Sequence, residues 1–320
     1  MAPEKKENLA PAKSNYPFSC LIKGLNKFSD YVTYNLGPGP QFIPMNWCIN
    51  MLKGLCGIYI FIIMLCYDNF SRGAWIYLTV HGSYGICWLL KDLIFPDSKY
   101  SVNITLLSST LPISVMYIYL IPGYRMLSLH SGNNPSTERI IICFTSYLVG
   151  IFLMICSDLQ IYYTTKYKPG LITTGFFKFT RNPNYIGEVL IYNSFAIIVG
   201  REEFWIILFF AYTIIFGIRM LIKDFSLSRK KGWTQYDSYM FLPKFSSCCL
   251  DNAIIYTTLF GLIYSVYICG GTASFLHEAN KIVFQYDSSS FCDKLHQSEL
   301  YQYAAILKDE VVQLITSYLK

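Results

Sequence analysis

The sequence predicts an all-α, polytopic membrane protein. Of its 320 residues, 53% are hydrophobic and 17% aromatic, whereas only 14% are charged. Soluble globular chains carry about 25% charged residues. This composition excludes a disordered chain, a coiled coil and a small disulfide-stabilised scaffold. We therefore expect helices that lie in a lipid bilayer, rather than an ordinary soluble enzyme.

Six or seven stretches are long and apolar enough to cross a bilayer. A membrane-spanning helix needs about 20 apolar residues, whereas a barrel strand needs about 10 residues of alternating character. These stretches are apolar on all sides, so helices are preferred. The fifth is short and contains Glu188, and the seventh follows a long polar segment. They lie at Cys48–Tyr67, Ala74–Leu90, Thr105–Ile121, Ile140–Cys156, Ile186–Gly200, Phe204–Ile222 and Ala253–Cys269.

The hydrophobic stretches divide the chain into four regions. Residues 1–45 form a polar N-terminal segment, which ends in a mixed apolar and basic stretch that we expect to be an interfacial amphipathic helix. Residues 46–250 form the main transmembrane domain, and residues 251–272 an additional transmembrane helix. Residues 273–320 form an amphipathic helical tail. Its apolar residues follow a heptad-like spacing at Leu300, Ala304, Leu307, Val311, Leu314 and Tyr318.

The basic residues predict an orientation. If the N-terminus is placed on side A, the side-B loops contain only four, which are Arg72, Arg125, Arg139 and Arg201. The side-A segments contain Lys5, Lys6, Lys13, Lys23, Lys27, Lys91, Lys99, Lys166, Lys168, Lys178, Arg181, Lys223, Arg229, Lys230, Lys231 and Lys244. Because basic loops stay on the inner side, side A is predicted to be the cytosol or the mitochondrial matrix. Both the endoplasmic reticulum and the mitochondrial inner membrane fit this pattern.

The cysteines and histidines do not predict a metal site. The eleven cysteines are scattered and form no CxxC pair, and the four histidines are dispersed. Most cysteines are therefore expected to be small apolar residues within helices. Cys248 and Cys249 follow a basic stretch, where reversible acylation is an alternative. The modest net charge of +6 gives no reason to expect a nucleic-acid partner.

Two polar segments on side A are candidates for a functional site. In the first, Asn182 and Pro183 are typical of a helix N-cap followed by the first helical residue. The free amides of such a terminus, next to Arg181, favour a phosphate or another anion. An alternative is a simple interfacial cap with a Glu–Arg pair. Asn184, Glu188 and Tyr192 are spaced by four and share one helix face.

The second segment runs from residue 219 to 244. It combines basic residues and hydroxyls with the aromatic side chains of Trp233 and Tyr236. Such a set can hold a cofactor that contains both phosphate and rings. The alternative is a juxtamembrane basic stretch that contacts anionic lipid headgroups.

Together these segments resemble a known family. The residues Arg181-Asn182-Pro183-Asn184-Tyr185-Ile186-Gly187-Glu188, followed by Lys223-Asp224 and Gly232-Trp233-Thr234-Gln235-Tyr236, are similar to the steroid 5-alpha-reductase C-terminal family, and most closely to its DUF1295 branch. His81-Gly82-Ser83-Tyr84-Gly85 is similar to the N-terminal half of that branch. Asn182 stands where many relatives have histidine, and Phe225 where sterol reductases usually have glutamate.

The resemblance implies a reductase-like transmembrane domain that binds NADPH from the cytoplasmic side and reduces the C=C bond of a lipid or sterol-like enone. Tyr84 and His81 would be the catalytic proton donors, although hydrogen bonding between helices is an alternative for both. The residues implied to line the cofactor site are Arg181, Asn184, Tyr185, Glu188, Lys223, Asp224, Arg229, Trp233 and Tyr236.

Two other functions stay open. Membrane methyltransferases that use S-adenosylmethionine share a similar Arg-x-Pro-x-Tyr-x-Gly motif. Glu188 and the pair Lys223-Asp224 favour the reductase branch over them. The chain is alternatively a catalytically reduced accessory subunit, without a cofactor, of a large membrane assembly such as a respiratory complex. In that case the N-terminal segment and the C-terminal helix would contact partner subunits.

Overall fold

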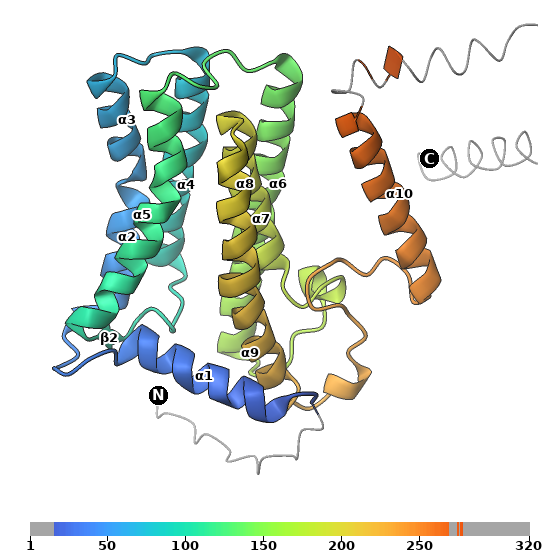
Figure 1. The fold of residues 1–320 in the computed structure, drawn as a ribbon. Helices are drawn as coiled ribbons and strands as arrows, with labels where there is room; N and C mark the ends of the chain where they lie inside the picture. Colours follow the sequence, from blue (N-terminus) through green and yellow to red (C-terminus); the bar gives the residue numbers. More distant parts are fainter. Residues whose placement is uncertain (1–15, 269–273, 275, 278–320) are drawn as a thin grey trace, which may run out of the picture. The chain divides into compact units, whose positions relative to one another are not determined.

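A computed structural model describes residues 16–268, 274, 276 and 277 of the chain, and most of them are helical (Figure 1). This confirms the predicted helical class. The chain divides into two units, residues 1–247 and 248–320. Within the second unit the structure describes one long helix, α10 (Cys249–Ile268). Residues 1–15 lie outside the described residues, and so does the predicted amphipathic tail apart from residues 274, 276 and 277.

The first unit contains nine α-helices among its described residues. They are α1 (Ser19–Tyr34), α2 (Met45–Gly54), α3 (Cys56–Cys66), α4 (Arg72–Ile94), α5 (Leu106–Ser128), α6 (Thr137–Tyr167), α7 (Pro183–Val199), α8 (Glu202–Phe210) and α9 (Gly217–Leu227). A π-helical segment, Ala211–Phe216, joins α8 to α9, and short 3-10 turns lie at Gly175–Lys178 and Trp233–Gln235.

Each predicted hydrophobic stretch coincides with helix in the structure. Three helical segments are long and apolar enough to cross a membrane, namely Met45–Cys66, Thr137–Tyr167 and Glu202–Leu227. The chain is therefore compatible with an integral membrane protein. The first of these segments is broken at Leu55, between α2 and α3. Large apolar side chains such as Ile62, Phe152 and Phe209 are exposed on the outside of the helices, as lipid-facing residues are.

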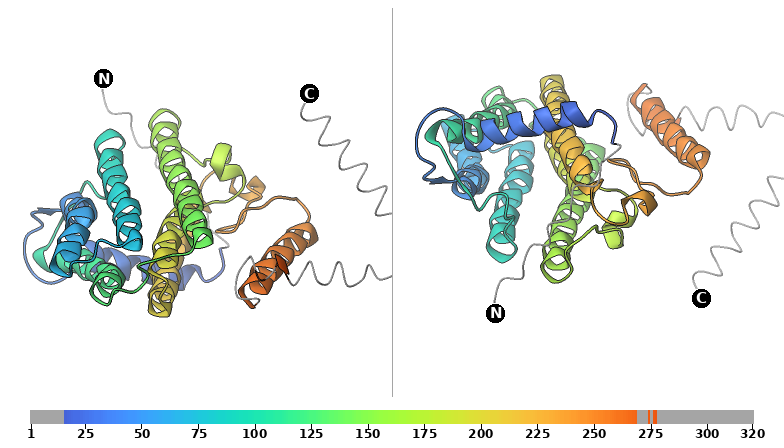
Figure 2. Two further views of the ribbon diagram at one scale, coloured as in Figure 1. Left: turned by 90° about the horizontal axis from the view of Figure 1, so that it is seen from above. Right: turned by 90° about the horizontal axis from the view of Figure 1, so that it is seen from below.

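The helices of the first unit form two groups, which appear side by side when the bundle is viewed along its length (Figure 2). One group contains α2, α3, α4 and α5, and the other contains α6, α7, α8 and α9. Contacts between α4 and α7 join the groups. The buried core, which includes Tyr84, Phe195 and Met154, lies along this junction.

A small antiparallel ladder departs from the all-helical bundle. In it β1 (Ile43–Pro44) pairs with β2 (Asn103–Ile104). The ladder fixes the start of α2 against the start of α5. Close by, α1 crosses the ends of α5 and α9 (Figure 1).

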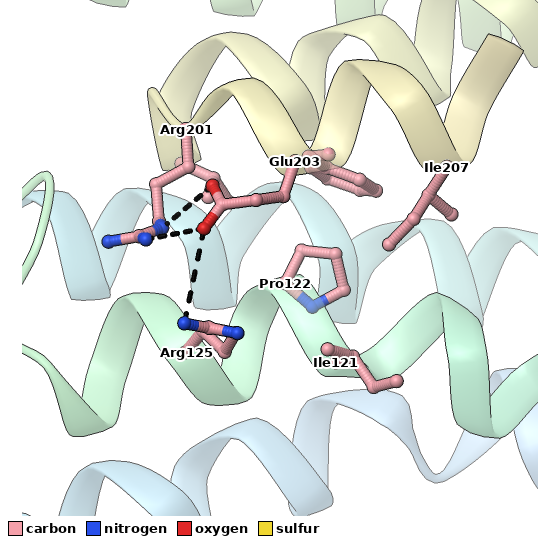
Figure 3. Close-up of a pocket in the computed structure, with 8 residues that line it drawn as sticks. Ile121, Pro122, Arg125, Arg201, Glu203 and Ile207 are labelled. Carbon is pink, nitrogen blue, oxygen red and sulfur yellow. Dashed lines mark hydrogen bonds and ion pairs between the residues drawn. The ribbon is translucent and has the colours of Figure 1, made fainter.

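The opposite end of the bundle has exposed ion pairs. Arg201 donates two hydrogen bonds to the carboxylate of Glu203 at the start of α8, at 3.1 and 2.5 Å. Arg125 of α5 lies 4.0 Å from the same carboxylate. These residues border a small pocket between α5 and α8 (Figure 3). Arg125 and Glu203 are exposed and Arg201 is half-buried, so the surrounding water and salt weaken the pairs.

The most extensive helix contact is between α6 and α7. A Cβ added at Gly187 would lie 2.5 Å from the backbone nitrogen of Met154 and 2.7 Å from the carbonyl oxygen of Gly150. Only glycine leaves room for the two backbones to approach this closely. This contact sets the position of α7, which carries the motif residues at its start.

We expect Gly187→Ala to lower the free energy of unfolding by about 1–3 kcal/mol, because the added methyl group must push α6 and α7 apart. Thermal unfolding in detergent measures this effect. Gly24→Ala is the matched control, since a Cβ at this helical glycine meets no atom within 4 Å. Equal unfolding temperatures for the two variants would contradict the prediction.

Candidate functional site

The two motif segments lie against each other, and Arg181 is their centre. Its Nε donates to Oδ1 of Asp224 at 2.6 Å, and a second guanidinium nitrogen donates to Oδ2 at 2.9 Å. The guanidinium also donates to the carbonyl oxygen of Ser238, and the Arg181 amide to that of Tyr239 at 2.9 Å. The ring of Trp233 lies 5.2 Å from the guanidinium carbon. Arg181 therefore links the start of α7 to α9 and to the following loop.

The Arg181–Asp224 ion pair is largely buried. The side chain of Asp224 is 2% exposed and that of Arg181 is 14% exposed. Two parallel hydrogen bonds suit a guanidinium and a carboxylate, and they offset the loss of hydration. Lys223 donates to the carbonyl oxygen of Arg181 at 3.3 Å, so a further cation lies beside the pair.

Backbone contacts hold the two motif segments together. The side chain of Asn182 donates to the carbonyl oxygen of Met240 at 2.7 Å, and Thr180 donates to that of Phe241 at 2.8 Å. The hydroxyl of Tyr236 donates to the carbonyl oxygen of Phe177 at 2.5 Å. Burial raises the pKa of Tyr236 to about 12. The second segment thus covers the turn that leads into α7.

The start of α7 matches the predicted cap. Asn182 is the N-cap and Pro183 the first helical residue, but the Asn182 side chain does not cap the helix amides. Its Oδ1 atom and that of Asn184 are buried and have no hydrogen-bond partner among the described residues. Arg229 lies over the ring of Phe225, 5.2 Å from its centre. The free amides at this helix start, with Lys223 beside them, suit an anionic ligand.

Tyr16 contacts this site from the other end of the chain. Its hydroxyl donates to Oδ2 of Asp224 at 3.1 Å, and its ring meets that of Phe225 edge-on at 5.9 Å. Burial and the negative charge of Asp224 raise the pKa of Tyr16 to about 12. The segment before α1 is therefore part of the motif region, which the sequence pattern did not indicate.

A second polar cluster lies inside the helices. Lys53 of α2 donates to the hydroxyl of Tyr84 at 2.6 Å, and this hydroxyl lies 3.1 Å from that of Tyr192. Tyr192 donates to Oε2 of Glu188 at 3.4 Å. Because an ammonium only donates and a carboxylate only accepts, the hydrogen bonds run in one direction from Lys53 to Glu188. This chain of four side chains, the Lys53–Glu188 chain, connects α2, α4 and α7.

Glycines bring α2 close enough for this contact. A Cβ at Gly85 would lie 2.3 Å from the carbonyl oxygen of Lys53 in α2. In the neighbouring helix α3, a Cβ at Gly57 would lie 3.1 Å from the Cα of Gly82. Gly82 and Gly85 flank Tyr84 in the sequence. The motif His81-Gly82-Ser83-Tyr84-Gly85 therefore combines Tyr84 with small residues that allow α2 and α3 to approach α4 closely.

Sequence reasoning missed several residues of the interior. Lys53 lies 3.3 Å from the ring centre of Trp88, and Lys91 forms a buried ion pair with Asp158 of α6. Arg219 of α9 lies within electrostatic range of Tyr100 and Glu188. The sequence did contain a signal for Lys53 and Arg219, because both are charged residues within predicted spans. Charged residues within a membrane span are energetically costly unless they have a role.

The remaining predicted residues occupy different surroundings. His81 is fully buried, and its ring stacks on that of Phe195 at 4.3 Å and meets that of Tyr77 edge-on at 5.2 Å. Tyr185 packs against Phe216, with ring centres 5.0 Å apart. The structure thus gathers Arg181, Asp224, Lys223, Trp233 and Tyr236 in the motif region and places Glu188 with Tyr84 in the interior.

The fold and these two clusters define a helical protein with membrane-compatible helices and paired polar motifs. Comparison with known families identifies the motif region: residues 102–239 match the family described as a protein of unknown function, DUF1295. This confirms the resemblance to DUF1295. The match includes both motif segments, whereas His81 and Tyr84 precede it. No curated protein and no solved structure matches the chain significantly.

We expect Asp224→Asn to lower the free energy of unfolding by about 3–5 kcal/mol, because it leaves the guanidinium of Arg181 buried without its counter-charge. Chemical unfolding in detergent measures the loss. Glu203→Gln removes an exposed partner of Arg201 and should have little effect. A similar loss of unfolding free energy for both variants would contradict the prediction that the burial of Asp224 causes the effect.

Tyr16 predicts a pH dependence. A raised pKa means that the folded state holds the phenol proton more tightly than the unfolded state. The stabilisation is therefore fully present below pH 10 and is lost as the pH rises towards 12. Between about pH 8 and pH 11, Tyr16→Phe should flatten the fall in unfolding temperature. Tyr31→Phe, at an exposed tyrosine of α1, is the control, and identical slopes for the two variants would refute the assignment.

Proposed function

We propose that this chain is a membrane-embedded, NADPH-dependent reductase that acts on the C=C bond of a lipid or sterol-like enone. In this proposal α2–α3, α4, α5, α6, α7 and α8–α9 are six spans, and α10 is a seventh. The motif region lies on the cytosolic side of the endoplasmic reticulum membrane or on the matrix side of the mitochondrial inner membrane. The basic residues of side A support this orientation.

The Lys53–Glu188 chain is the observation that carries the proposal. A lysine, a glutamate and two tyrosine hydroxyls lie within hydrogen-bond distance of one another among apolar helices. Ionisable groups at such positions are rare, and they mark proton pathways or substrate sites in membrane proteins. Tyr84 is also the residue that the family resemblance assigns as a proton donor.

This arrangement supports acid catalysis by Tyr84. When bound, NADPH would supply a hydride to one carbon of the double bond. Tyr84 transfers its phenolic proton to the other carbon, and the O–H bond of Tyr84 breaks as the C–H bond forms. Lys53 then faces a phenolate oxygen, which its ammonium stabilises through a charge-assisted hydrogen bond. A proton from Lys53 restores the phenol, and Lys53 regains its own proton from the aqueous side. His81, enclosed by aromatic rings, is the weaker candidate for this role.

The motif region fits the charge of the cofactor. Lys223, Arg229 and the amides at the start of α7 are donors for phosphate groups, and the unpartnered Oδ1 atoms of Asn182 and Asn184 are acceptors. Trp233 and Tyr236 offer aromatic faces for rings. Arg181 orients this set through Asp224, and Tyr185 packs beneath it against Phe216.

A second candidate function is that of a catalytically reduced accessory subunit. The specific observation in its favour is that the guanidinium of Arg181 already binds Asp224 and Ser238, as it would in a purely structural motif. In this alternative no cofactor binds, and partner subunits contact the N-terminal segment and the C-terminal tail.

Cofactor protection tests the proposal. NADPH at about 100 times its dissociation constant should raise the free energy of unfolding by about 2.7 kcal/mol. The double variant Lys223→Met, Arg229→Met should lose most of this protection, because two phosphate donors are removed. Lys166→Met, an exposed lysine at the end of α6, is the matched control. Thermal unfolding of the purified full chain measures all three proteins.

The other outcomes select the alternatives. Protection by S-adenosylmethionine instead of NADPH would establish the methyltransferase function and contradict the reductase. Protection by neither compound would contradict both enzymatic functions and favour the accessory subunit. Lys53→Met should leave NADPH binding unchanged, since Lys53 belongs to the interior cluster and not to the motif region.

A further inference from the structure

Helix α1 has a second apolar face that the described part of the protein does not cover. Its inner face packs on α5 and α9 and buries Ile22. On the outer face, Leu21 and Phe28 are exposed, and Tyr31 is exposed one turn further along. Phe18, the N-cap residue of α1, is exposed as well. Phe18 is 78% exposed and Phe28 is 67% exposed. Exposed aromatic residues on one helix face indicate a binding surface.

The position of α1 is fixed at the end of the bundle. The hydroxyl of Thr105, the N-cap of α5, donates to the carbonyl oxygen of Leu36 at 2.7 Å. Ser108 donates to that of Val32 at 3.1 Å. At the other end of α1, Tyr16 binds Asp224 in the last turn of α9. Since α5 begins and α9 ends here, α1 lies where predicted spans leave the bilayer.

Charged groups lie along one edge of the outer face. Lys23 and Lys27 are exposed and one turn apart, and they are followed by Asp30, which accepts a hydrogen bond from Asn26 at 2.9 Å. Helical spacing places these residues between the inner and the outer apolar faces. A helix with aromatic and aliphatic residues on one face and lysines at its edge is typical of one that lies in the headgroup layer.

Further exposed aromatic residues lie at the same end of the bundle (Figure 1). Phe42 and Trp47 lie just before and within the start of α2, and both are exposed. The ladder between β1 and β2 joins this segment to the start of α5. Exposed tryptophan and phenylalanine at one level of a helical bundle form the aromatic belt that marks a membrane interface.

We propose that the outer face of α1 lies in the bilayer interface and that Lys23 and Lys27 bind anionic phospholipid headgroups. The charge complementarity supports lipid as the occupant, because the side of the bundle that carries α1 also carries most of the basic residues outside the predicted spans. This inference is independent of the reductase proposal. It requires only that the chain is embedded in a membrane.

Site-directed spin labelling tests the orientation. The full chain is prepared with every cysteine replaced except the buried Cys56 and Cys143. A nitroxide is then attached at Phe28→Cys on the outer face or at Asp30→Cys on the charged edge. In vesicles of phosphatidylcholine and phosphatidylglycerol, the ratio of oxygen to nickel-chelate accessibility should be several-fold higher at position 28.

Two results would overturn the proposal. A high accessibility to the nickel chelate at position 28 would place the outer face in water. Exclusion of both reagents at this position would show that protein covers it, as a second copy of the chain would.

A second measurement keeps all the native cysteines, so that it does not depend on the cysteine variant. A photoactivated diazirine that resides in the lipid phase should label Phe28 and Tyr31, as detected by mass spectrometry of the α1 peptides. Labelling should fall several-fold in the double variant Lys23→Gln, Lys27→Gln. It should also fall several-fold when phosphatidylglycerol is left out of the vesicles. An absence of label in α1 would refute the lipid contact, and labelling independent of both changes would refute the role of the lysines.

Discussion

Charged side chains inside an apolar helix bundle must find partners, and this constraint organises the structure. A single buried charge without a partner costs several kcal/mol, so each one fixes the element that compensates it. Arg181 and Asp224 join α7 to α9, and Lys91 and Asp158 join α4 to α6. Sliding the joined helices past one another would separate each pair and leave both charges buried without a partner. These polar links therefore define their register.

Close backbone contact is the second requirement, because short polar links need helices that nearly touch. Gly85 lets α2 approach α4 until Lys53 reaches Tyr84, and Gly150 with Gly187 does the same for α6 and α7. The interior hydrogen-bond chain thus depends on residues that carry no functional group. Larger side chains at these glycines would separate the donors from their acceptors before they changed any charge.

The sequence was sufficient to predict the helices but not their partners. Each apolar stretch became helix, because composition and length decide that outcome locally. The helix ends were predicted less well, since α6 runs to Tyr167 instead of Cys156 and α5 runs to Ser128 instead of Ile121. The break at Leu55 and the π-helical turn before α9 were not predictable, since tertiary packing overrides an apolar run that looks uniform. The contact of Tyr16 with Asp224 joins residues 208 positions apart, and no local pattern encodes it.

The candidate site shows the same division. Arg181 and Asp224 were both selected from the motifs as cofactor residues, yet in the structure each is the other's partner. The guanidinium of Arg181 already donates to both oxygens of Asp224 and to the carbonyl oxygen of Ser238, so three of its five N–H groups are engaged within the protein. Arg181 therefore acts best as a fixed support that holds Trp233 and the start of α7. The charge that remains for an anion comes from Lys223, from Arg229 and from the helix amides, which are the groups the ion pair leaves available.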